Sequence, residues 1–211
     1  MVIALVSKTV MPMRVQAGQV YSHKLAVFAT DSFADQAVLS SSLHQLWAIQ
    51  NSSTMRLDVN YSPSDVFCTF PRPTATEALE SIGKVLDAER GEIMLRRDLG
   101  LTKLYNLVND PGLPDDLDPD VARLRGIHVQ LDLSVMTAYG WDDVQLDHGF
   151  HTYRKMTRWT VSPAARVEIL DRLLAENHRR AALQIEGQLA ESGHDTDEFD
   201  DEVVDIEGDL E

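Results

Sequence analysis

Residues 51–73 restrict the fold of this chain more than any other stretch. They show no helical periodicity, and their prolines, at positions 63, 71 and 73, break any helix. Proline lacks a hydrogen-bond donor and biases the residue before it toward extended backbone. We therefore interpret this stretch as an irregular connector between a front part that contains strands and a rear part whose patterns are helical.

The front part predicts a small antiparallel sheet with one helix packed on it. In residues 31–50, apolar side chains recur at three- and four-residue spacing after a cap at Asp31 or Ser32, so one helix is expected to cover the sheet. Three stretches rich in aliphatic and aromatic residues are expected to be the strands: Val2–Val6, Met11–Val15 and Gln19–Ala29.

The rear part carries repeated signals for helix starts and stops. A capping-box spacing, Thr74-Ala-Thr-Glu77, opens one helix, and a second covers Leu101 to about Asn109. Proline directly after a capping residue, in Asp118-Pro119 and Ser162-Pro163, opens two more, and Gly140 ends the first of these. We therefore expect an α+β chain with a mainly α-helical rear.

Charge is distributed unevenly along the chain. The net charge is -15, from 34 acids and 19 lysines and arginines, yet residues 195–211 alone hold ten acids and no base. A segment this acidic and poor in aromatics cannot bury enough surface to offset the entropy lost on ordering, so we expect residues 192–211 to be disordered. The predicted organisation is the end of a target-recognition domain at 1–73, a helical domain at 74–191 and the acidic tail.

Two stretches outside the tail suit an anionic partner. Residues 1–30 contain Lys8, Arg14 and Lys24 and no acid, while residues 151–180 hold seven lysines and arginines against three acids. Cationic side chains that displace counterions from phosphate supply much of the affinity of proteins for DNA. These stretches are where a nucleic acid is expected to bind.

Several segments resemble the end of the target-recognition region and the helical tail of MmeI-like fused methyltransferase-restriction enzymes and their relatives in phage defence. The resemblance covers roughly residues 1–185, and the order of the segments is its most specific feature. It is carried by Leu39-Ser-Ser-Ser-Leu-His44-Gln-Leu-Trp47, Arg56, Tyr61-Ser-Pro-Ser-Asp65-Val-Phe67-Cys-Thr-Phe70-Pro-Arg-Pro73, Leu101 to Asp110, the helix through His128 and Leu131, Ala138-Tyr-Gly-Trp-Asp142-Asp, Leu146-Asp-His-Gly-Phe150 and Leu170 to Arg180.

The resemblance implies N6 methylation of adenine with S-adenosylmethionine by a catalytic domain upstream of this region. No catalytic residue of that reaction is expected in this chain, because no strand leads into a G-x-G cofactor loop and no two prolines are adjacent. No Glu-x-Lys of a magnesium nuclease is present either. The expected role is therefore to bind double-stranded DNA while a methyltransferase catalytic domain or subunit, which binds the cofactor, extrudes the base.

Eight residues are the candidates for DNA contact. Five lie on or beside the early strands, where side chains reach base edges or phosphates from a rigid support, although a solvated sheet face explains each of them as well. For His44, a hydrogen-bonded histidine packed beside Trp47 is the favoured alternative. Arg56 and Tyr61 are interpreted either as a phosphate clamp or as ordinary connector residues. The eight are Ser7, Lys8, Arg14, His23, Lys24, His44, Arg56 and Tyr61.

Other sites are not expected. His148 and His151 with Asp142, Asp143 and Asp147 match no compact zinc motif, and a turn between helices explains the acids. Arg154, Lys155, Arg158, Arg179 and Arg180 either follow a phosphate backbone or neutralise nearby acids. Without a membrane span or secretory signal, and with Cys68 as the single cysteine, a cytoplasmic protein is expected. The alternative function is a protein-interaction module whose acidic tail docks on a basic partner or mimics DNA.

Overall fold

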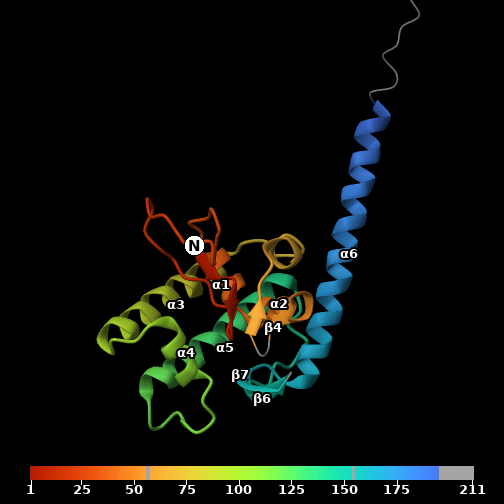
Figure 1. Cartoon of the computed structure of the whole chain (residues 1–211). Coiled ribbons are helices and arrows are strands. Elements are labelled where there is room, and N and C mark those ends of the chain that lie inside the picture. Colours follow the sequence, from red (N-terminus) through yellow and green to blue (C-terminus); the bar gives the residue numbers. More distant parts are fainter. Residues whose placement is uncertain (56–57, 154, 195–211) are drawn as a thin grey trace, which may run out of the picture.

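The computed structural model describes residues 1–55, 58–153 and 155–194, and it confirms an α+β fold (Figure 1). Its strands form three small antiparallel sheets, ordered β1-β3, β2-β5-β4 and β6-β7. The strands are β1 (Val2–Ala4), β2 (Val6–Ser7), β3 (Leu25–Val27), β4 (Ser53–Met55), β5 (Asp58–Asn60), β6 (Gly149–Tyr153) and β7 (Met156–Thr160).

The helices pack around one continuous core that includes residues from Met1 to Leu173. The predicted boundary at residue 73 does not interrupt this core, because α1 of the front part packs on α3 of the rear part. The helices are α1 (Phe33–Ser40), α2 (Ser42–Asn51), the π-helical turn η1 (Pro63–Phe67), α3 (Glu77–Arg96), α4 (Leu101–Val108), α5 (Pro119–Tyr139) and α6 (Pro163–His194).

The front part differs from its prediction in its strands and in its helix. The strand expected over Gln19–Ala29 is only β3, and the strand expected over Val2–Val6 is divided between β1 and β2, which belong to different sheets. Residues 11–15 are not a strand, and only an isolated bridge joins Met13 to Val2. The expected helix over 31–50 is two helices, because Ser41 is extended, with φ -73° and ψ 157°, and caps α2 by accepting a hydrogen bond from the His44 N–H. The hydroxyl of a serine competes well with helical backbone bonding, which explains the break.

The connector is more regular than its prolines predict. Residues 53–55 form β4 and residues 58–60 form β5, and β5 also pairs with β2, with Ser7 opposite Val59. The prolines do bound this regular segment: Pro63 opens η1, and the chain from Pro71 to Pro73 is irregular. The connector therefore completes a sheet with the first strands instead of only linking two parts.

The predicted caps of the rear helices are largely confirmed. Asp118 accepts from the Val121 N–H at the start of α5, and Gly140 ends that helix with φ 73°. Ser162 accepts from the Ala165 N–H at the start of α6, which continues to His194 and so extends into the segment predicted as disordered. The cap of α3 is Thr76, where Thr74 was expected.

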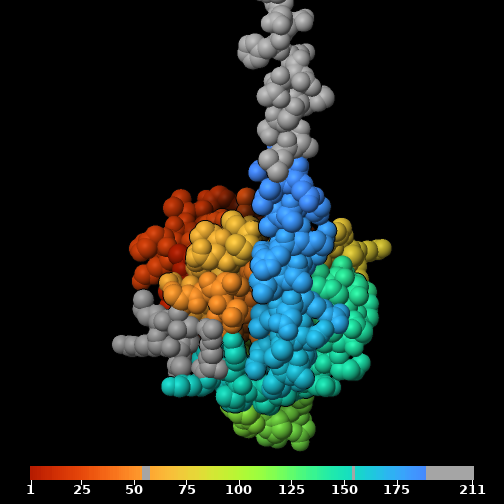
Figure 2. Space-filling view, turned by 90° about the vertical axis from the view of Figure 1, so that its right-hand side faces the viewer, coloured from red at the N-terminus to blue at the C-terminus, as the bar shows by residue number. Residues whose placement is uncertain are grey.

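The β6-β7 hairpin and α6 occupy one side of the molecule. The hairpin, which no sequence pattern predicts, lies beside the first turn of α6 (Figure 1). The first half of α6 lies on the surface of the body, and its later part projects beyond it (Figures 1 and 2). Among the helices that the structure describes, none is both long and apolar enough to cross a bilayer.

Candidate nucleic-acid interface

Lys8 and Lys24 lie beside the first strands, because Lys8 directly follows β2 and Lys24 directly precedes β3. The carbonyl of Lys24 accepts a hydrogen bond from the Leu5 N–H at 2.9 Å, so Lys24 is beside Leu5. Lys8 follows Leu5 by three residues, which span at most about 10 Å. Both lysine side chains are exposed, as is His23, and neither lysine forms an ion pair among the described residues. This edge of the molecule thus presents cations to solvent.

Ser7 and one acid complete this edge. The Ser7 hydroxyl donates to the carbonyl of Thr9 at 2.7 Å, which holds the chain on either side of Lys8 in a turn. Asp58 is the acid closest in register, because Ser7 pairs with Val59 on the neighbouring strand. It borders the same cavity as Lys8, a groove of about 450 Å³ between the first strands, β1 and β2, and α4.

Arg158 connects this edge to the β6-β7 hairpin. Its guanidinium donates to the carbonyl of Lys8 and, at 3.3 Å, to the hydroxyl of Thr9. Only 8% of Arg158 is exposed, and burial lowers its pKa to about 10, so it remains charged at neutral pH. Lys155 lies exposed in the turn of the same hairpin, at φ 67°. The two basic stretches of the sequence, 150 residues apart, are therefore adjacent in space.

Arg14 is not part of this edge. Its guanidinium lies 4.0 Å from the centre of the Phe33 ring and donates to the carbonyl of Asp31 at 2.7 Å. Lys84 lies 5.6 Å from the same ring. Arg14 therefore fastens the first residues to the start of α1, and the structure does not bring it together with Lys8.

His44 and Tyr61 lie in the core. They are 0% and 2% exposed, and the histidine Nε2 is 3.1 Å from the tyrosine hydroxyl while its Nδ1 is 2.8 Å from the carbonyl of Leu39. Burial lowers the pKa of His44 to about 4 and raises the pKa of Tyr61. Neither side chain reaches the surface in this structure, as the packed alternative for His44 expects. Arg56 lies outside the described residues.

The remaining cations of the rear part mostly face acids. Arg179 and Arg180 both donate to Glu176, at 2.7 and 2.6 Å, which lowers the pKa of Glu176 to about 2. Arg172, the next cation toward the hairpin, pairs with Asp143 at 2.6 Å. Neutralisation of acids thus accounts for Arg179 and Arg180, while Arg154 lies outside the described residues.

The histidines and acids around residue 148 do not assemble a metal site. His148 Nε2 lies 2.8 Å from the carboxylate of Asp132, and His151 Nε2 lies 3.1 Å from the carbonyl of Asp147. No group of three metal-ligating side chains occurs within the described ranges. Asp132 is 0% exposed and also accepts from the Ser42 N–H at 2.8 Å, so the pair joins α5 to the start of α2.

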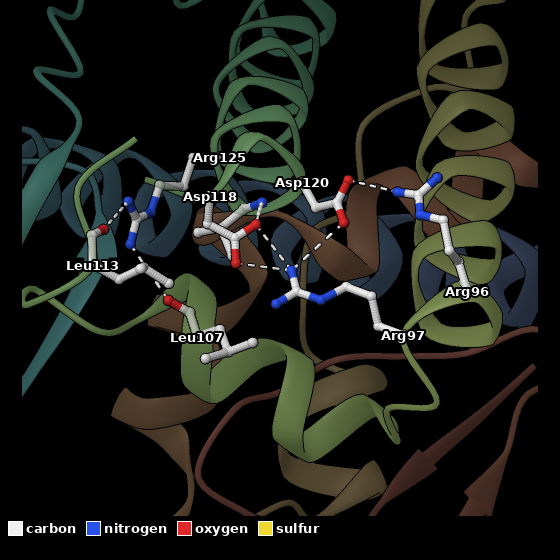
Figure 3. Close-up of polar contacts among 8 residues, drawn as sticks. Arg96, Arg97, Leu107, Leu113, Asp118, Asp120 and Arg125 are labelled. Atoms are coloured by element: carbon white, nitrogen blue, oxygen red, sulfur yellow. Dashed lines mark hydrogen bonds and ion pairs between the residues drawn. The ribbon is translucent and has the colours of Figure 1, made fainter. Parts of the chain in front are cut away.

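Arg125 and its neighbours hold the loop that precedes α5 (Figure 3). Its guanidinium, 2% exposed, donates to the carbonyls of Val108 and Leu113 at 3.0 and 2.8 Å. It also lies 4.8 Å from the centre of the Phe150 ring, on the hairpin. Nearby, Arg97 pairs with the capping residue Asp118 at 2.8 Å. These contacts, which periodicity alone does not reveal, hold the loop before α5, and the contact with Phe150 joins it to the hairpin.

The fold of this chain is similar to part of a known restriction enzyme. A structure described as the type IIL restriction-modification enzyme MmeI in complex with DNA matches 86% of this chain with a TM-score of 0.57 at 18% sequence identity. The match covers 21% of that chain, so this protein spans about a fifth of the length of its structural neighbour. No protein-family model matches the sequence, and no curated protein sequence matches it significantly.

Proposed function

We propose that this chain is the DNA-binding portion of an adenine-specific N6 DNA methyltransferase of a restriction-modification or phage-defence system. Methyl transfer and the binding of S-adenosylmethionine belong to a catalytic domain or subunit elsewhere, and the whole assembly acts on double-stranded DNA in the cytoplasm. The proposed DNA-contacting residues are Ser7, Lys8, His23, Lys24 and Lys155.

The observation that carries this proposal is the contact between Arg158 and the Lys8–Thr9 segment. It places Lys8 and the hairpin turn that bears Lys155 on neighbouring segments. Lys24 is hydrogen-bonded to Leu5, which is at most about 10 Å of chain away from Lys8. A duplex carries one negative charge for about every 1.7 Å of its axis, so a short row of lysines meets several phosphates. The exposed His23 beside the row adds a hydrogen-bond donor, while the hydroxyl of Ser7 holds the turn at Lys8.

The structural neighbour supports the same role, because its structure was determined with DNA bound. The chain matches only a fifth of that enzyme, and it lacks a cofactor loop in its sequence. Both facts agree with a role in positioning DNA while the methyl transfer takes place elsewhere, on another polypeptide or on another part of a longer polypeptide.

A salt titration of duplex binding tests the proposal. We expect residues 1–194, without the acidic tail, to bind a fluorescent 30-base-pair duplex with the weak affinity of non-specific complexes, a Kd of roughly 1–100 µM. Lys8→Gln with Lys24→Gln should reduce the slope of log K against log salt by about 2, because two counterion-releasing contacts are lost. Arg123→Gln, on α5 and paired with Glu89, is the matched control. Equal slopes for both variants would refute the assignment.

The second candidate is a protein-interaction module, and the projecting part of α6 favours it. Leu183 and Ile185 there are 53% and 58% exposed, and ten acids follow the helix. In this case neither the full chain nor residues 1–194 should bind a duplex, and a basic protein partner should require residues 195–211.

A further inference from the structure

One face of α6 packs on the body and sets the direction of the opposite face. Ala165, Ile169 and Leu173 are buried in the core. Further along, Asn177 and Arg180 donate to backbone carbonyls of the connector, at 2.6 and 2.7 Å. These five residues lie on one side of the helix at a spacing of three and four, so the other side points away from the body.

The outward side carries an apolar stripe. Val167, Leu174 and Ile185 are 58%, 48% and 58% exposed, and the exposed residues His178 and Ala181 lie between the last two. The positions follow one another at steps of seven, four, three and four, and the exposed Asp171 lies between the first two. This is the spacing of the seam of a two-helix coiled coil. A seam with this repeat is suited to another helix, because knobs at these positions enter holes on a facing helix.

We propose that two copies of this chain associate through this stripe, with their α6 helices antiparallel. The spacing of the stripe is symmetric about residue 176: Val167 and Ile185 are equally far from it, as are Leu174 and His178, and the counterpart of Ala181 is Asp171. In an antiparallel pair with twofold symmetry, Val167 of one copy therefore faces Ile185 of the other. Such self-complementarity is what an isologous interface requires.

Charge selects the antiparallel orientation. Each α6 leads directly into ten acids, which a parallel pair would place side by side. His194 ends α6 and lies 18 residues after residue 176, so at about 1.5 Å per residue an antiparallel pair separates the ends of the two helices by roughly 54 Å. This is far beyond the screening length of about 8 Å at physiological salt. It also brings the C-terminal end of each α6 toward the hairpin end of the other copy, where Lys155 is exposed.

The shape of the molecule permits this arrangement. The lower part of α6 stands as a ridge on one face of the molecule (Figure 2). Since the stripe points away from the body, a second body lies on the far side of the paired helices. The proposal is independent of DNA binding, because the stripe contains none of the proposed DNA contacts.

Sedimentation velocity of the full chain over 5–500 µM tests the association. We expect a species of twice the 23.6 kDa monomer mass to form as concentration rises. Leu174→Glu should weaken the dimer at least tenfold, whereas Leu95→Glu on α3, where the wild-type leucine is 85% exposed, should not change it. A monomer throughout the range, or equal dimerisation of both variants, would overturn the proposal.

Disulfide trapping tests the orientation separately. In a Cys68→Ser background, a Val167→Cys chain is mixed with an Ile185→Cys chain of different mass and oxidised. The antiparallel pair predicts disulfides between the two kinds of chain. Disulfides formed mainly between identical chains would indicate a parallel pair and would contradict the proposal.

Discussion

Gly83 allows α1 and α3 to approach closely, and replacing it should strongly destabilise the fold. A Cβ atom at this position would overlap the backbone carbonyl oxygen of Phe33 and lie 2.7 Å from the carbonyl carbon. Because this neighbour is backbone, it cannot rotate away, so either the two helices separate or α1 shifts. Overpacking costs about 1–3 kcal/mol, and we expect Gly83→Ala to lie at the upper end of that range.

Gly91→Ala is the matched control on the same helix. Nothing lies within 4 Å of a Cβ added there, so the substitution gains helix propensity and should stabilise by up to about 1 kcal/mol. Urea unfolding followed by circular dichroism measures the change in the free energy of unfolding for both variants. For a chain of this size, Gly83→Ala should lower Tm by roughly 6–12 °C. A Gly83→Ala protein within about 0.5 kcal/mol of wild type would refute the close-packing argument.

Three further predictions concern buried polar groups. Burial lowers the pKa of His44 to about 4 in the folded protein, against about 6.5 in the unfolded chain. The stability that neutral His44 contributes is therefore complete above pH 6.5 and is lost as pH falls toward 4. Between pH 7 and 5 the free energy of unfolding should fall by about 2 kcal/mol. Urea unfolding of His44→Gln should show a correspondingly weaker pH dependence, and an unchanged one would contradict this. Asp132→Ala removes the acceptor for Ser42 and His148 and should cost about 3–5 kcal/mol, whereas alanine at an exposed aspartate of α6 should change stability little. Arg125→Lys cannot reproduce the forked contacts with the loop before α5 and should cost about 3 kcal/mol by the same assay; retained stability would show those contacts to be dispensable.

Local signals predicted much of the rear part because helix ends depend on neighbours in sequence. The caps at Asp118 and Ser162 and the left-handed Gly140 are set by one side chain or one backbone conformation each. The break at Ser41 was missed because the apolar spacing continues across it, although three consecutive serines were a signal for it. The cap at Thr76 in place of Thr74 is a choice between two equivalent hydroxyls.

The candidate site was only partly predictable because its assembly depends on distant contacts. Sequence identified two basic stretches, but nothing local indicates that Arg158 binds the segment at Lys8. Sequence equally cannot distinguish a free cation such as Lys8 from Arg14, which is stacked on Phe33. The hairpin itself was missed because its strands are short and follow a turn rich in acids.

Photo-crosslinking tests most directly whether the edge formed by Lys8, Lys24 and the β6-β7 hairpin contacts DNA. A photoreactive amino acid is placed singly at position 8, 155 or 95 of the full chain, with a labelled duplex at low salt, so that weak complexes are trapped. We predict crosslinks from positions 8 and 155 that disappear at high salt, and none from position 95 on α3. Equal labelling from all three positions, or none from 8 and 155, would contradict a DNA-binding role for this edge.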